Sequence, residues 1–285
     1  MTRIAGVVVL YDPPSGILER IETYRNQVEV LFAIDNSERV GSRIQETLEK
    51  LGNVVYQWNG RNLGIARALN TGAALAIQRG CDFLLMMDQD SEGSPTLVEE
   101  LLRAHSDVVK FHVGILYAYH EYQNYHQRKG KDTVSEIFLA DTAGTLLDLQ
   151  AYRKAGSFLE DLFIDYVDFE YCLRLHSKGF TLWRVNNATI YQRLGNLSPA
   201  KFLWWKVGVS NHTPIRMYYR IRNRLVVARN YFKYYPAWSL KEFILTPYVL
   251  VKMLAFEEHR WEKTKMAGRG IRDFALGRLG KYQQA

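Results

Sequence analysis

Four short apolar runs alternate with segments of helical periodicity at the start of the chain. The runs cover residues 4–10 (IAGVVVL), 28–34, 53–58 and 82–87. Between the last two runs, apolar side chains recur at helical spacing, at Ile65, Leu69, Ala73, Ala76 and Ile77. Short apolar runs predict strands that are buried on both faces, and the spacing between them predicts helices. This alternation predicts βαβ units, and therefore a parallel sheet covered by helices on both faces.

The pattern changes after residue 110. Shorter strand candidates at 111–118, 134–139, 144–149 and 180–185 enclose one expected helix at 167–178. From Tyr218 onward the spacing predicts helices, and we expect breaks at Pro236 and Pro247 because proline lacks the amide hydrogen of a helical turn. No linker rich in Gly, Ser or Pro separates these parts. We therefore expect one α/β domain with a C-terminal helical appendage.

Composition excludes several classes of protein. With 47% hydrophobic residues, the chain of 285 residues is too apolar for a disordered protein. Cys81 and Cys172 are too few for a disulfide framework or a cysteine-based zinc site. The first residues resemble a buried strand rather than a signal peptide, and the apolar stretch 243–256 is shorter than the ~20 residues that span a bilayer. We therefore expect a cytoplasmic, globular protein.

Charge is distributed unevenly along the chain. Residues 1–200 contain 20 Lys and Arg against 25 Asp and Glu, whereas residues 201–285 contain 17 against 5. A basic C-terminal region favours an anionic partner, such as a membrane surface, a polyphosphate or a nucleic acid. The alternative interpretation is an ordinary solvated helical face.

Three polar groups directly follow predicted strands, at the edge where a parallel sheet binds its ligands. They are Tyr11-Asp12, Asp35-Asn36-Ser37 and Asp88-Gln89-Asp90. Two carboxylates separated by one residue suit a hard divalent cation that keeps open positions for phosphate oxygens. The alternative is an ordinary turn, with the aspartates capping a helix at Thr96.

A glycine-rich segment precedes the third predicted helix. In residues 60–72 (GRNLGIARALNTG), Asn62 and Gly64 predict a turn that opens a helix. The amides at the start of that helix, with Arg61 or Arg67, could meet a diphosphate. A capped helix start with small residues for close packing accounts for the pattern equally well.

Acidic and aromatic residues alternate in residues 163–174 (FIDYVDFEYCLR). Asp165 and Asp168 are flanked by aromatic side chains, which can tune the pKa of a carboxylate for work as a general base. These two residues are therefore the catalytic candidates.

Taken in this order, the motifs resemble a known family. VVVLY, DNS, NLGIARALNTG, MDQD and GTLLDLQAYRKAGSFLEDLFIDYVDFEYCLRLHSKG resemble family 2 inverting glycosyltransferases of the GT-A fold. HTPIRMYYRIRNRLVVARNYF resembles the rhamnosyltransferase branch, which builds bacterial O-antigens and capsules. The resemblance implies a Rossmann-like catalytic domain over residues 1–200, with a nucleotide-sugar half at 1–110 and an acceptor half at 111–200. A basic, aromatic helical region would follow at 201–285.

The resemblance implies roles for the residues of the nucleotide site. Tyr11 and Asp35 would contact the nucleobase and the ribose. Arg61, Asn62 and Arg67 would lie near the nucleotide. These roles belong to the family and are carried over by matching its motifs.

The resemblance also implies a cofactor and a base. Asp88 would lie by the ribose and the metal, and Asp90 would bind a Mg²⁺ or Mn²⁺ ion that bridges the diphosphate. Asp168 matches the family's catalytic base, with Asp165 as the alternative, because Val167 replaces the first acidic residue of the family's Glu-Asp pair. Transfer from dTDP-β-L-rhamnose with inversion would give an α-L-rhamnoside.

One position departs from the family. Many members have a histidine two residues before Leu-Gly, where this chain has Gln192 followed by Arg193, Leu194 and Gly195. Glutamine is a poor metal ligand, so the sequence leaves open whether Gln192 or His212 takes the histidine's place. His212 is equally consistent with an ordinary core or surface histidine.

The branch often acts on polyprenyl-diphosphate-linked glycans at the inner face of the cell membrane, so we expect a glycan acceptor of that kind. The C-terminal region interleaves basic and aromatic residues: Lys201, Phe202, Trp204, Trp205, Lys206, Lys233, Trp238, Lys241, Phe243 and Lys252. This composition suits peripheral contact with an anionic membrane. The alternative is that the aromatic residues form a helical core or a homodimer contact.

Three other functions remain as alternatives. The first is a family 2 transferase that uses a UDP-sugar. The second is a nucleic-acid-binding protein, which would leave the acidic clusters without a role. The third is a catalytically silent scaffold. We rank all three below rhamnosyl transfer and expect no nucleic-acid partner.

Overall fold

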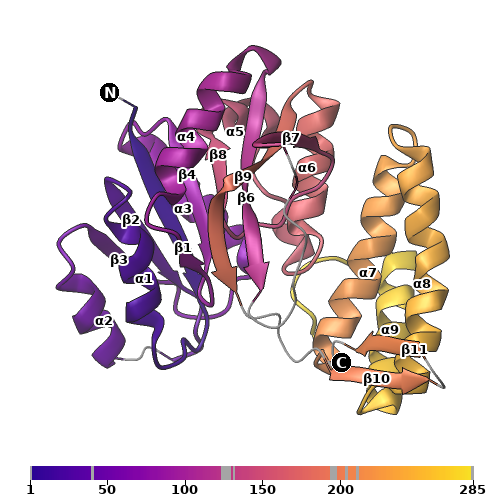
Figure 1. Cartoon of the computed structure of the whole chain (residues 1–285). Helices are drawn as coiled ribbons and strands as arrows, with labels where there is room; N and C mark the ends of the chain where they lie inside the picture. Colours follow the sequence, from indigo (N-terminus) through magenta and orange to yellow (C-terminus); the bar gives the residue numbers. More distant parts are fainter. Residues whose placement is uncertain are drawn as a thin grey trace. The chain divides into compact units, whose positions relative to one another are not determined.

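The computed structural model describes residues 2–39, 42–122, 130, 132–192, 198–202, 205–209 and 212–283. Internal contacts divide the chain into two compact units. The sheet unit comprises residues 1–158 and 171–193, and the helical unit comprises residues 159–170 and 194–285. Figure 1 shows the elements of each unit in the colours of the sequence.

One mixed sheet forms the centre of the sheet unit. Its strand order is β3 (Val54–Trp58), β2 (Val30–Asp35), β1 (Ile4–Leu10), β4 (Phe83–Asp88), β8 (Thr145–Asp148), β6 (Val113–Tyr122), β9 (Thr181–Gln192) and β5 (Glu92–Gly93), with β7 (Val134–Ile137) also paired to β9. The strands β3, β2, β1 and β4 are mutually parallel, whereas β8 runs antiparallel to β4 and β6. The four predicted parallel strands are therefore confirmed.

Helices cover both faces of this sheet (Figure 1). On one face, α1 (Ile17–Arg25), α2 (Ser42–Glu49) and α4 (Leu97–Val108) share a core with Val8. On the other face, α3 (Ile65–Gln78) lies so close that a Cβ at Gly72 would stand 2.5 Å from the Val7 side chain. Because successive residues of a strand point to opposite faces, this contact places α3 opposite the first three helices.

The later part of the sheet unit contains more helix than the sequence predicts. The expected helix at 167–178 is α6 (Val167–Ser177). A second helix, α5 (Leu149–Ala155), has two turns, too few to show a periodic apolar pattern, and the Asp148 carboxylate caps it by accepting from the amides of Gln150 and Ala151. The 3₁₀ turn η1 (Val109–Phe111) also belongs to the sheet unit, whereas the 3₁₀ turn η2 (Glu160–Leu162) belongs to the helical unit.

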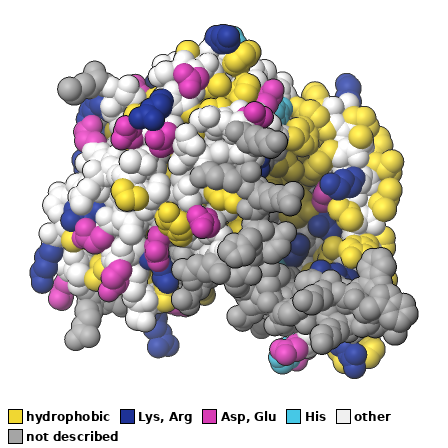
Figure 2. Space-filling model, in the orientation of Figure 1, with side chains coloured by type: hydrophobic (Ala, Val, Ile, Leu, Met, Phe, Trp, Pro, Cys, Tyr) yellow, Lys and Arg dark blue, Asp and Glu magenta, His cyan; other side chains and the backbone are white. Residues whose placement is uncertain are grey.

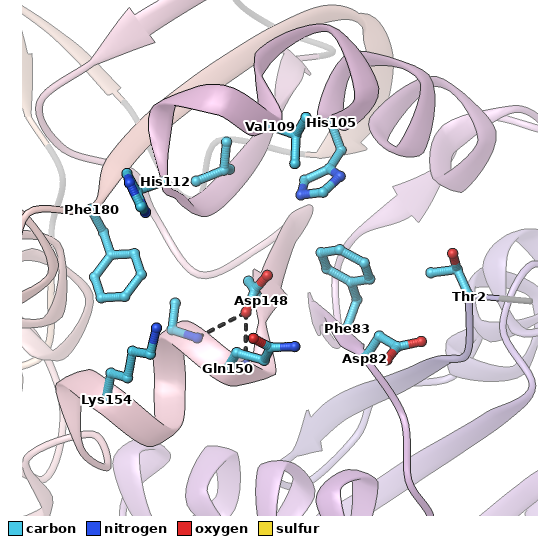
Figure 3. Close-up of a pocket in the computed structure, with 12 residues that line it drawn as sticks. Thr2, Asp82, Phe83, His105, Val109, His112, Asp148, Gln150, Lys154 and Phe180 are labelled. Atoms are coloured by element: carbon cyan, nitrogen blue, oxygen red, sulfur yellow. Dashed lines mark hydrogen bonds between the residues drawn. The ribbon is translucent and has the colours of Figure 1, made fainter.

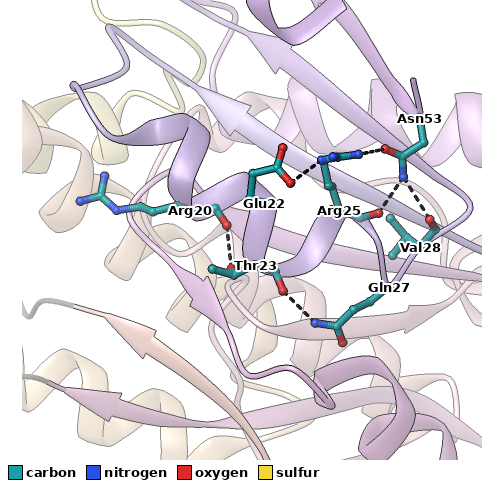
Figure 4. A network of polar contacts seen from close by, with 7 residues as sticks. All are labelled: Arg20, Glu22, Thr23, Arg25, Gln27, Val28 and Asn53. Carbon is teal, nitrogen blue, oxygen red and sulfur yellow. Dashed lines mark hydrogen bonds and ion pairs between the residues drawn. The ribbon is translucent and has the colours of Figure 1, made fainter. Parts of the chain in front are cut away.

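A polar network fixes the end of α1 to the start of β3 (Figure 4). Arg25 Nη1 donates to Asn53 Oδ1 at 3.0 Å, and Asn53 Nδ2 donates to the carbonyls of Arg25 and Val28 at 2.7 and 3.3 Å. Gln27 Nε2 donates to the Thr23 carbonyl at 2.9 Å. These bonds satisfy carbonyls that the end of a helix leaves without partners, and they hold the loop that leads into β2.

Besides η2 and the first residues of α6, the described residues of the helical unit form three helices and a hairpin. The hairpin pairs β10 (Ser198–Phe202) with β11 (Trp205–Val209). The helices α7 (Pro214–Tyr231), α8 (Pro236–Phe256) and α9 (Arg260–Ala275) pack against one another around Met217, Ile221, Leu225, Met253 and Ala267. A Cβ at Gly270 would lie 2.7 Å from the Tyr218 carbonyl oxygen, so α9 can approach α7 this closely only with glycine there.

The two expected proline breaks have different outcomes. Pro236 begins α8, where the missing amide hydrogen costs nothing. The predicted break at Pro247 is wrong, because this residue lies inside α8. Val249 and Leu250 pack on the core of the three helices just beyond it, and this packing outweighs the local cost of the proline. Within the described ranges, none of the helices combines the length and the apolar character needed to cross a bilayer.

Candidate functional site

Strand register gathers the predicted polar groups at the carboxyl edge of the sheet. Leu10 of β1 pairs with Asp35 of β2, and Asp35 pairs with Trp58 of β3. On the other side of β1, Val9 pairs with Asp88 of β4. The three groups that follow strands therefore lie along one edge, as the sequence predicts.

The carboxylate of Asp35 is held from three directions. Its Oδ1 accepts from the Ser37 amide at 2.8 Å and from the Ser37 hydroxyl at 2.5 Å. Its Oδ2 accepts from the Tyr56 hydroxyl at 2.7 Å. Burial, together with this bond to Asp35, raises the pKa of Tyr56, so the phenol stays protonated and keeps donating. The buried Asp35 is thus part of a rigid polar framework.

Two aromatic side chains are exposed beside this framework. Tyr11 is 44% exposed and Trp58 is 42% exposed. Trp58 Nε1 donates to the Ser37 carbonyl at 2.9 Å, which fixes the indole ring. An anchored, exposed aromatic ring is a surface on which a planar ligand can stack. The sequence analysis missed Trp58 and Tyr56, although an aromatic residue at a strand end was the available signal.

Gln89 holds the acidic turn against β1. Its Oε1 accepts from the Tyr11 amide at 2.9 Å, and its Nε2 donates to the Tyr11 carbonyl at 3.1 Å. The Ser91 amide donates to the Asp88 carbonyl at 3.1 Å and closes the turn. The neighbours of Gln89 therefore have a fixed backbone, with Asp88 half-buried and Asp90 exposed.

This donor set fits a hard divalent cation. Mg²⁺ in phosphate-transfer sites is usually bound through one or two carboxylates and substrate phosphate oxygens. Asp88 and Asp90 are two such carboxylates on a turn that Gln89 holds in place. Among the described residues there is no cluster of three or more His, Cys, Asp or Glu side chains that could hold a metal ion.

Gln192 lies beside the acidic turn. β5 pairs with the end of β9, and Gln192 Nε2 donates to the Ser91 hydroxyl at 2.5 Å. The imidazole of His120, buried on β6, also interacts with Gln192, and burial lowers its pKa. The segment Arg193, Leu194 and Gly195 lies outside the described residues.

The loop before α3 forms the predicted turn. Asn62 Oδ1 accepts from the Gly64 amide at 2.9 Å, and Asn36 Nδ2 donates to the Gly64 carbonyl at 3.0 Å. The side chains of Arg61 and Arg67 are exposed on either side of it. The role of these residues toward a diphosphate stays a prediction.

Asp165 and Asp168 lie in the helical unit, so they belong to a different compact unit from the acidic turn. Asp165 Oδ1 is 3.3 Å from Arg216 Nε, and its Oδ2 is buried without a hydrogen-bond partner among the described residues. Burial raises the pKa of Asp165, while Arg216 and Arg220 act against that shift. Asp168 is half-buried in the first turn of α6, where the helix dipole stabilises a carboxylate.

His212 has cationic surroundings. Burial and the charges of Arg216, Arg220 and Lys263 lower its pKa to about 4. A neutral imidazole can bind a metal, but three nearby cations repel one. Gln192, the other residue considered for the missing histidine, contacts the acidic turn through Ser91.

Acid should destabilise the protein partly through His212. The pKa of His212 in the folded chain lies below the ordinary value of 6.5. Between about pH 4 and 6.5, the unfolded chain therefore binds a proton at His212 that the folded chain does not bind. The free energy of unfolding should therefore fall as the pH drops from about 6.5 toward 4, and His212→Asn should flatten this decline. Thermal unfolding of both proteins across this range measures the difference. Parallel profiles would contradict the assigned environment.

A cavity of about 600 Å³ opens at the opposite, amino edge of the sheet. Figure 3 shows Phe83, His105, Asp148 and Lys154 around it. The lining comes from the starts of β4 and β6 and from α4 and α5. None of the sequence-predicted site residues lines this cavity.

Comparison with known proteins agrees with this arrangement. The family model described as Glycosyl transferase family 2 matches residues 7–156. A relative named dTDP-rhamnosyl transferase RfbF, from Shigella flexneri, is 25% identical over 244 residues, which is 80% of each chain.

Solved structures show the same fold. S. aureus TarS 1-349, in complex with UDP-GlcNAc, aligns over 97% of this chain and 82% of its own, with a TM-score of 0.59 and 12% identity. GalNAc-T7, solved with UDP, GalNAc and Mn²⁺, aligns over 97% of this chain and 57% of its own, with a TM-score of 0.62 and 13% identity. At these identities the likeness concerns the fold.

Proposed function

Because the chain belongs to glycosyl transferase family 2 and has the GT-A fold, we propose that it transfers L-rhamnose from dTDP-β-L-rhamnose to a glycan acceptor with inversion. The observation that carries the proposal is the carboxyl edge, where strand register brings Asp35, Trp58 and Asp88 together. A nucleotide needs a stacking surface, a partner for its ribose and charge compensation for its diphosphate. We assign the stacking surface to Trp58, the ribose contact to the polar framework around Asp35, and the charge compensation to a divalent cation beside Asp88.

The donor is assigned by likeness to a relative. The Shigella flexneri protein named dTDP-rhamnosyl transferase supports rhamnose on a dTDP carrier. The TarS complex with UDP-GlcNAc favours the second candidate, a UDP-sugar donor. Both donors carry a pyrimidine and a diphosphate, so the same residues would serve either one.

The nucleotide would bind at the carboxyl edge of the sheet. Tyr11 and Trp58, both exposed, would stack on the base, and the framework around Asp35 would orient the ribose. Arg61 and Arg67, beside the start of α3, would approach the diphosphate together with the amides of that helix.

Asp88 and Asp90 would hold Mg²⁺ or Mn²⁺. The ion, when bound, offsets the negative charge that a nucleoside diphosphate gains as the glycosidic bond breaks. Gln89 would keep both carboxylates in place through its two bonds to Tyr11. Gln192 would support the same turn through Ser91.

Asp168 would act as the general base, with Asp165 as its alternative. The acceptor hydroxyl loses a proton as its oxygen attacks the anomeric carbon from the face opposite the leaving group. One carboxylate within about 3 Å of that oxygen is sufficient for this step. A single displacement of this kind inverts the anomeric centre.

Product analysis tests the proposal. The chain would be incubated with ¹³C-labelled dTDP-β-L-rhamnose and a lipid-linked bacterial glycan fraction, and NMR would follow the labelled anomeric carbon. We expect an α-L-rhamnoside and an equal amount of dTDP. A β-linked product, or transfer from UDP-glucose alone under the same conditions, would contradict the proposal.

The helical unit would contact the membrane that carries a lipid-linked acceptor. Figure 2 shows hydrophobic side chains over α8, where Leu240, Ile244, Tyr248 and Val251 are between 53 and 66% exposed. These residues recur at helical spacing and form an apolar stripe. Exposed lysines of this unit, such as Lys233 and Lys241, provide charge complementary to anionic lipid.

Of the aromatic residues singled out in the sequence, the structure describes the side chains of Trp238, which is half-buried, and Phe243. Phe243 packs against the core of the three helices, as the alternative interpretation holds. Trp204 lies outside the described residues, and so do the side chains of Lys201, Phe202, Trp205 and Lys206. The stripe on α8, which the sequence analysis missed, therefore carries the membrane proposal.

Binding to vesicles tests this surface. The wild-type chain should float with vesicles that contain anionic phosphatidylglycerol at low salt, and the double variant Ile244→Ser, Val251→Ser should lose most of the bound fraction, because it removes two apolar contacts from the stripe. Val109→Ser, at an exposed apolar residue of the sheet unit, is the matched control. Equal flotation of all three proteins would contradict docking through α8.

A further inference from the structure

The backbone just before α6 is strained. Phe163, Asp165 and Tyr166 have φ values of 68°, 59° and 66°, in a region that residues with a Cβ rarely adopt. The Ile164 amide donates to the Leu162 carbonyl at 2.8 Å, which closes a γ-turn around Phe163. Such a conformation persists only where the surrounding structure determines it, and it is common at functional sites.

Asn223 of α7 provides the contacts that determine this backbone. Its side chain is fully buried. Its Nδ2 lies 2.8 Å from the carbonyl oxygen of Leu162, 2.7 Å from that of Ile164 and 2.9 Å from that of Asp165. The two hydrogens of this NH₂ group are thus shared among three carbonyl oxygens of the strained segment, and the positive φ values allow these carbonyls to converge on it.

Arg222 fixes the direction of this carboxamide. Its Nε donates to Asn223 Oδ1 at 2.9 Å, so the NH₂ group of Asn223 must face the strained segment. Its Nη2 donates to the carbonyls of Leu162 and Asp161 at 3.1 and 3.3 Å. Arg222 is 1% exposed, and each of these bonds is therefore made away from water.

Neighbouring residues of α7 extend the same contact. Arg224 Nε donates to the Tyr166 hydroxyl at 2.5 Å and lies 3.0 Å from Glu242 Oε2. The Tyr166 hydroxyl donates to Glu242 Oε2 at 2.6 Å. Arg216 Nε reaches Asp165 Oδ1. α7 thus contacts the backbone or side chain of successive residues on the segment that carries both candidate bases.

We propose that Asn223, oriented by Arg222, is a positioning residue for sugar transfer. It sets the backbone of residues 162–165 and so the direction in which the carboxylates of Asp165 and Asp168 point. The inference rests on the proposed function, which assigns the general base to this segment. A reacting group displaced by about 1 Å can lose about 10²-fold in rate, so this backbone is where positioning has a large effect.

Steady-state kinetics of Asn223→Ala test the proposal against a matched control. Lys263→Met breaks the buried ion pair between Lys263 and Glu257, with 2.8 Å between Nζ and Oε2, in the same unit but away from the strained segment. Below the melting temperature of both variants, Asn223→Ala should lower kcat by about 10²-fold, with KM and Kd for the nucleotide sugar within about twofold of wild type. Lys263→Met should keep the wild-type kcat despite a similar loss of thermal stability.

Equal kcat values in the two variants would overturn the positioning role, and so would a loss confined to KM. Should Asn223→Ala not fold, Arg222→Lys replaces it, because lysine keeps the charge but cannot hold Asn223 and Leu162 at once. We expect Arg222→Lys to lower kcat while KM stays unchanged. A wild-type kcat in this variant would also overturn the positioning role of Asn223.

The outcomes also separate this inference from the proposed function. If the wild-type chain transfers no sugar, the proposed function fails and the positioning role fails with it. If the wild-type chain transfers sugar and both α7 variants match it, the function stands and the positioning role alone is overturned. Amide hydrogen exchange of residues 162–166 gives a readout without activity, and we expect faster exchange in Asn223→Ala than in Lys263→Met.

Discussion

Replacing Asp168 by asparagine is expected to lower the rate of sugar transfer by about 10² to 10⁴-fold, the usual contribution of a general base. A carboxamide has nearly the same shape as the carboxylate but cannot accept the proton of the acceptor hydroxyl. Binding of the nucleotide sugar should remain unchanged, because the proposal assigns Asp168 to the acceptor hydroxyl and no nucleotide contact to it. Initial rates and calorimetric titration of the same preparation measure both quantities.

Asp165→Asn is the matched control for this experiment. It removes an equivalent charge three residues earlier, and it also removes the partner of Arg216. A smaller loss in this variant supports Asp168 as the base. Full activity of Asp168→Asn together with an inactive Asp165→Asn would move the role to Asp165, whose pKa burial raises.

Replacing Asp90 by alanine is expected to abolish metal-dependent binding of the donor. The exposed carboxylate of Asp90 would contribute charge and a ligand oxygen where the diphosphate needs compensation. Loss of such a charged contact should weaken donor binding by about 10²-fold in Mg²⁺ and leave residual binding that no longer responds to the metal. Calorimetric titrations with and without Mg²⁺ give the two values.

Asp107→Ala removes a charge from the exposed surface of α4 and controls for the change in net charge. It should bind the donor as the wild type does. Metal-dependent binding that survives in Asp90→Ala would show that this carboxylate is not a ligand.

The sheet could be predicted because its signals are local. The run at residues 4–10 is apolar throughout, and it becomes β1 with the same bounds. Asp88 could be placed at a strand end for the same reason, since it directly follows five buried residues. Where apolar periodicity is long and uninterrupted, the sequence alone is sufficient.

The supporting residues of the site could not be predicted, because their partners are distant in the chain. Gln89 can hold the acidic turn only because β4 pairs with β1. This pairing brings Gln89 to Tyr11, which is 78 positions away in the chain. His120 looks like an ordinary strand residue until β9 brings Gln192 to it. Hydrogen bonds between distant residues leave no periodic signal in the sequence.

The burial of polar residues in the helical unit could not be predicted either, because their partners are also distant in the chain. The spacing predicts a helix from Tyr218 onward, but nothing in the sequence marks Arg222, Asn223 and Arg224 as buried residues. They are buried because the segment at residues 159–170 packs in the same compact unit and offers carbonyls to them. A charged side chain is buried only where hydrogen-bond or ion-pair partners surround it, and the sequence alone does not show which residues those partners are.

Calorimetric binding of a panel of nucleotide sugars to the wild-type chain tests the central claim most directly. The panel contains dTDP-β-L-rhamnose, UDP-glucose, UDP-galactose and GDP-mannose, each titrated with and without Mg²⁺. We predict selective binding of dTDP-β-L-rhamnose that depends on the metal. Selective binding of a UDP-sugar would contradict rhamnose as the transferred sugar, but it would agree with the fold and with the roles proposed for Asp90 and Asp168. Binding of none of the four would contradict the proposed function.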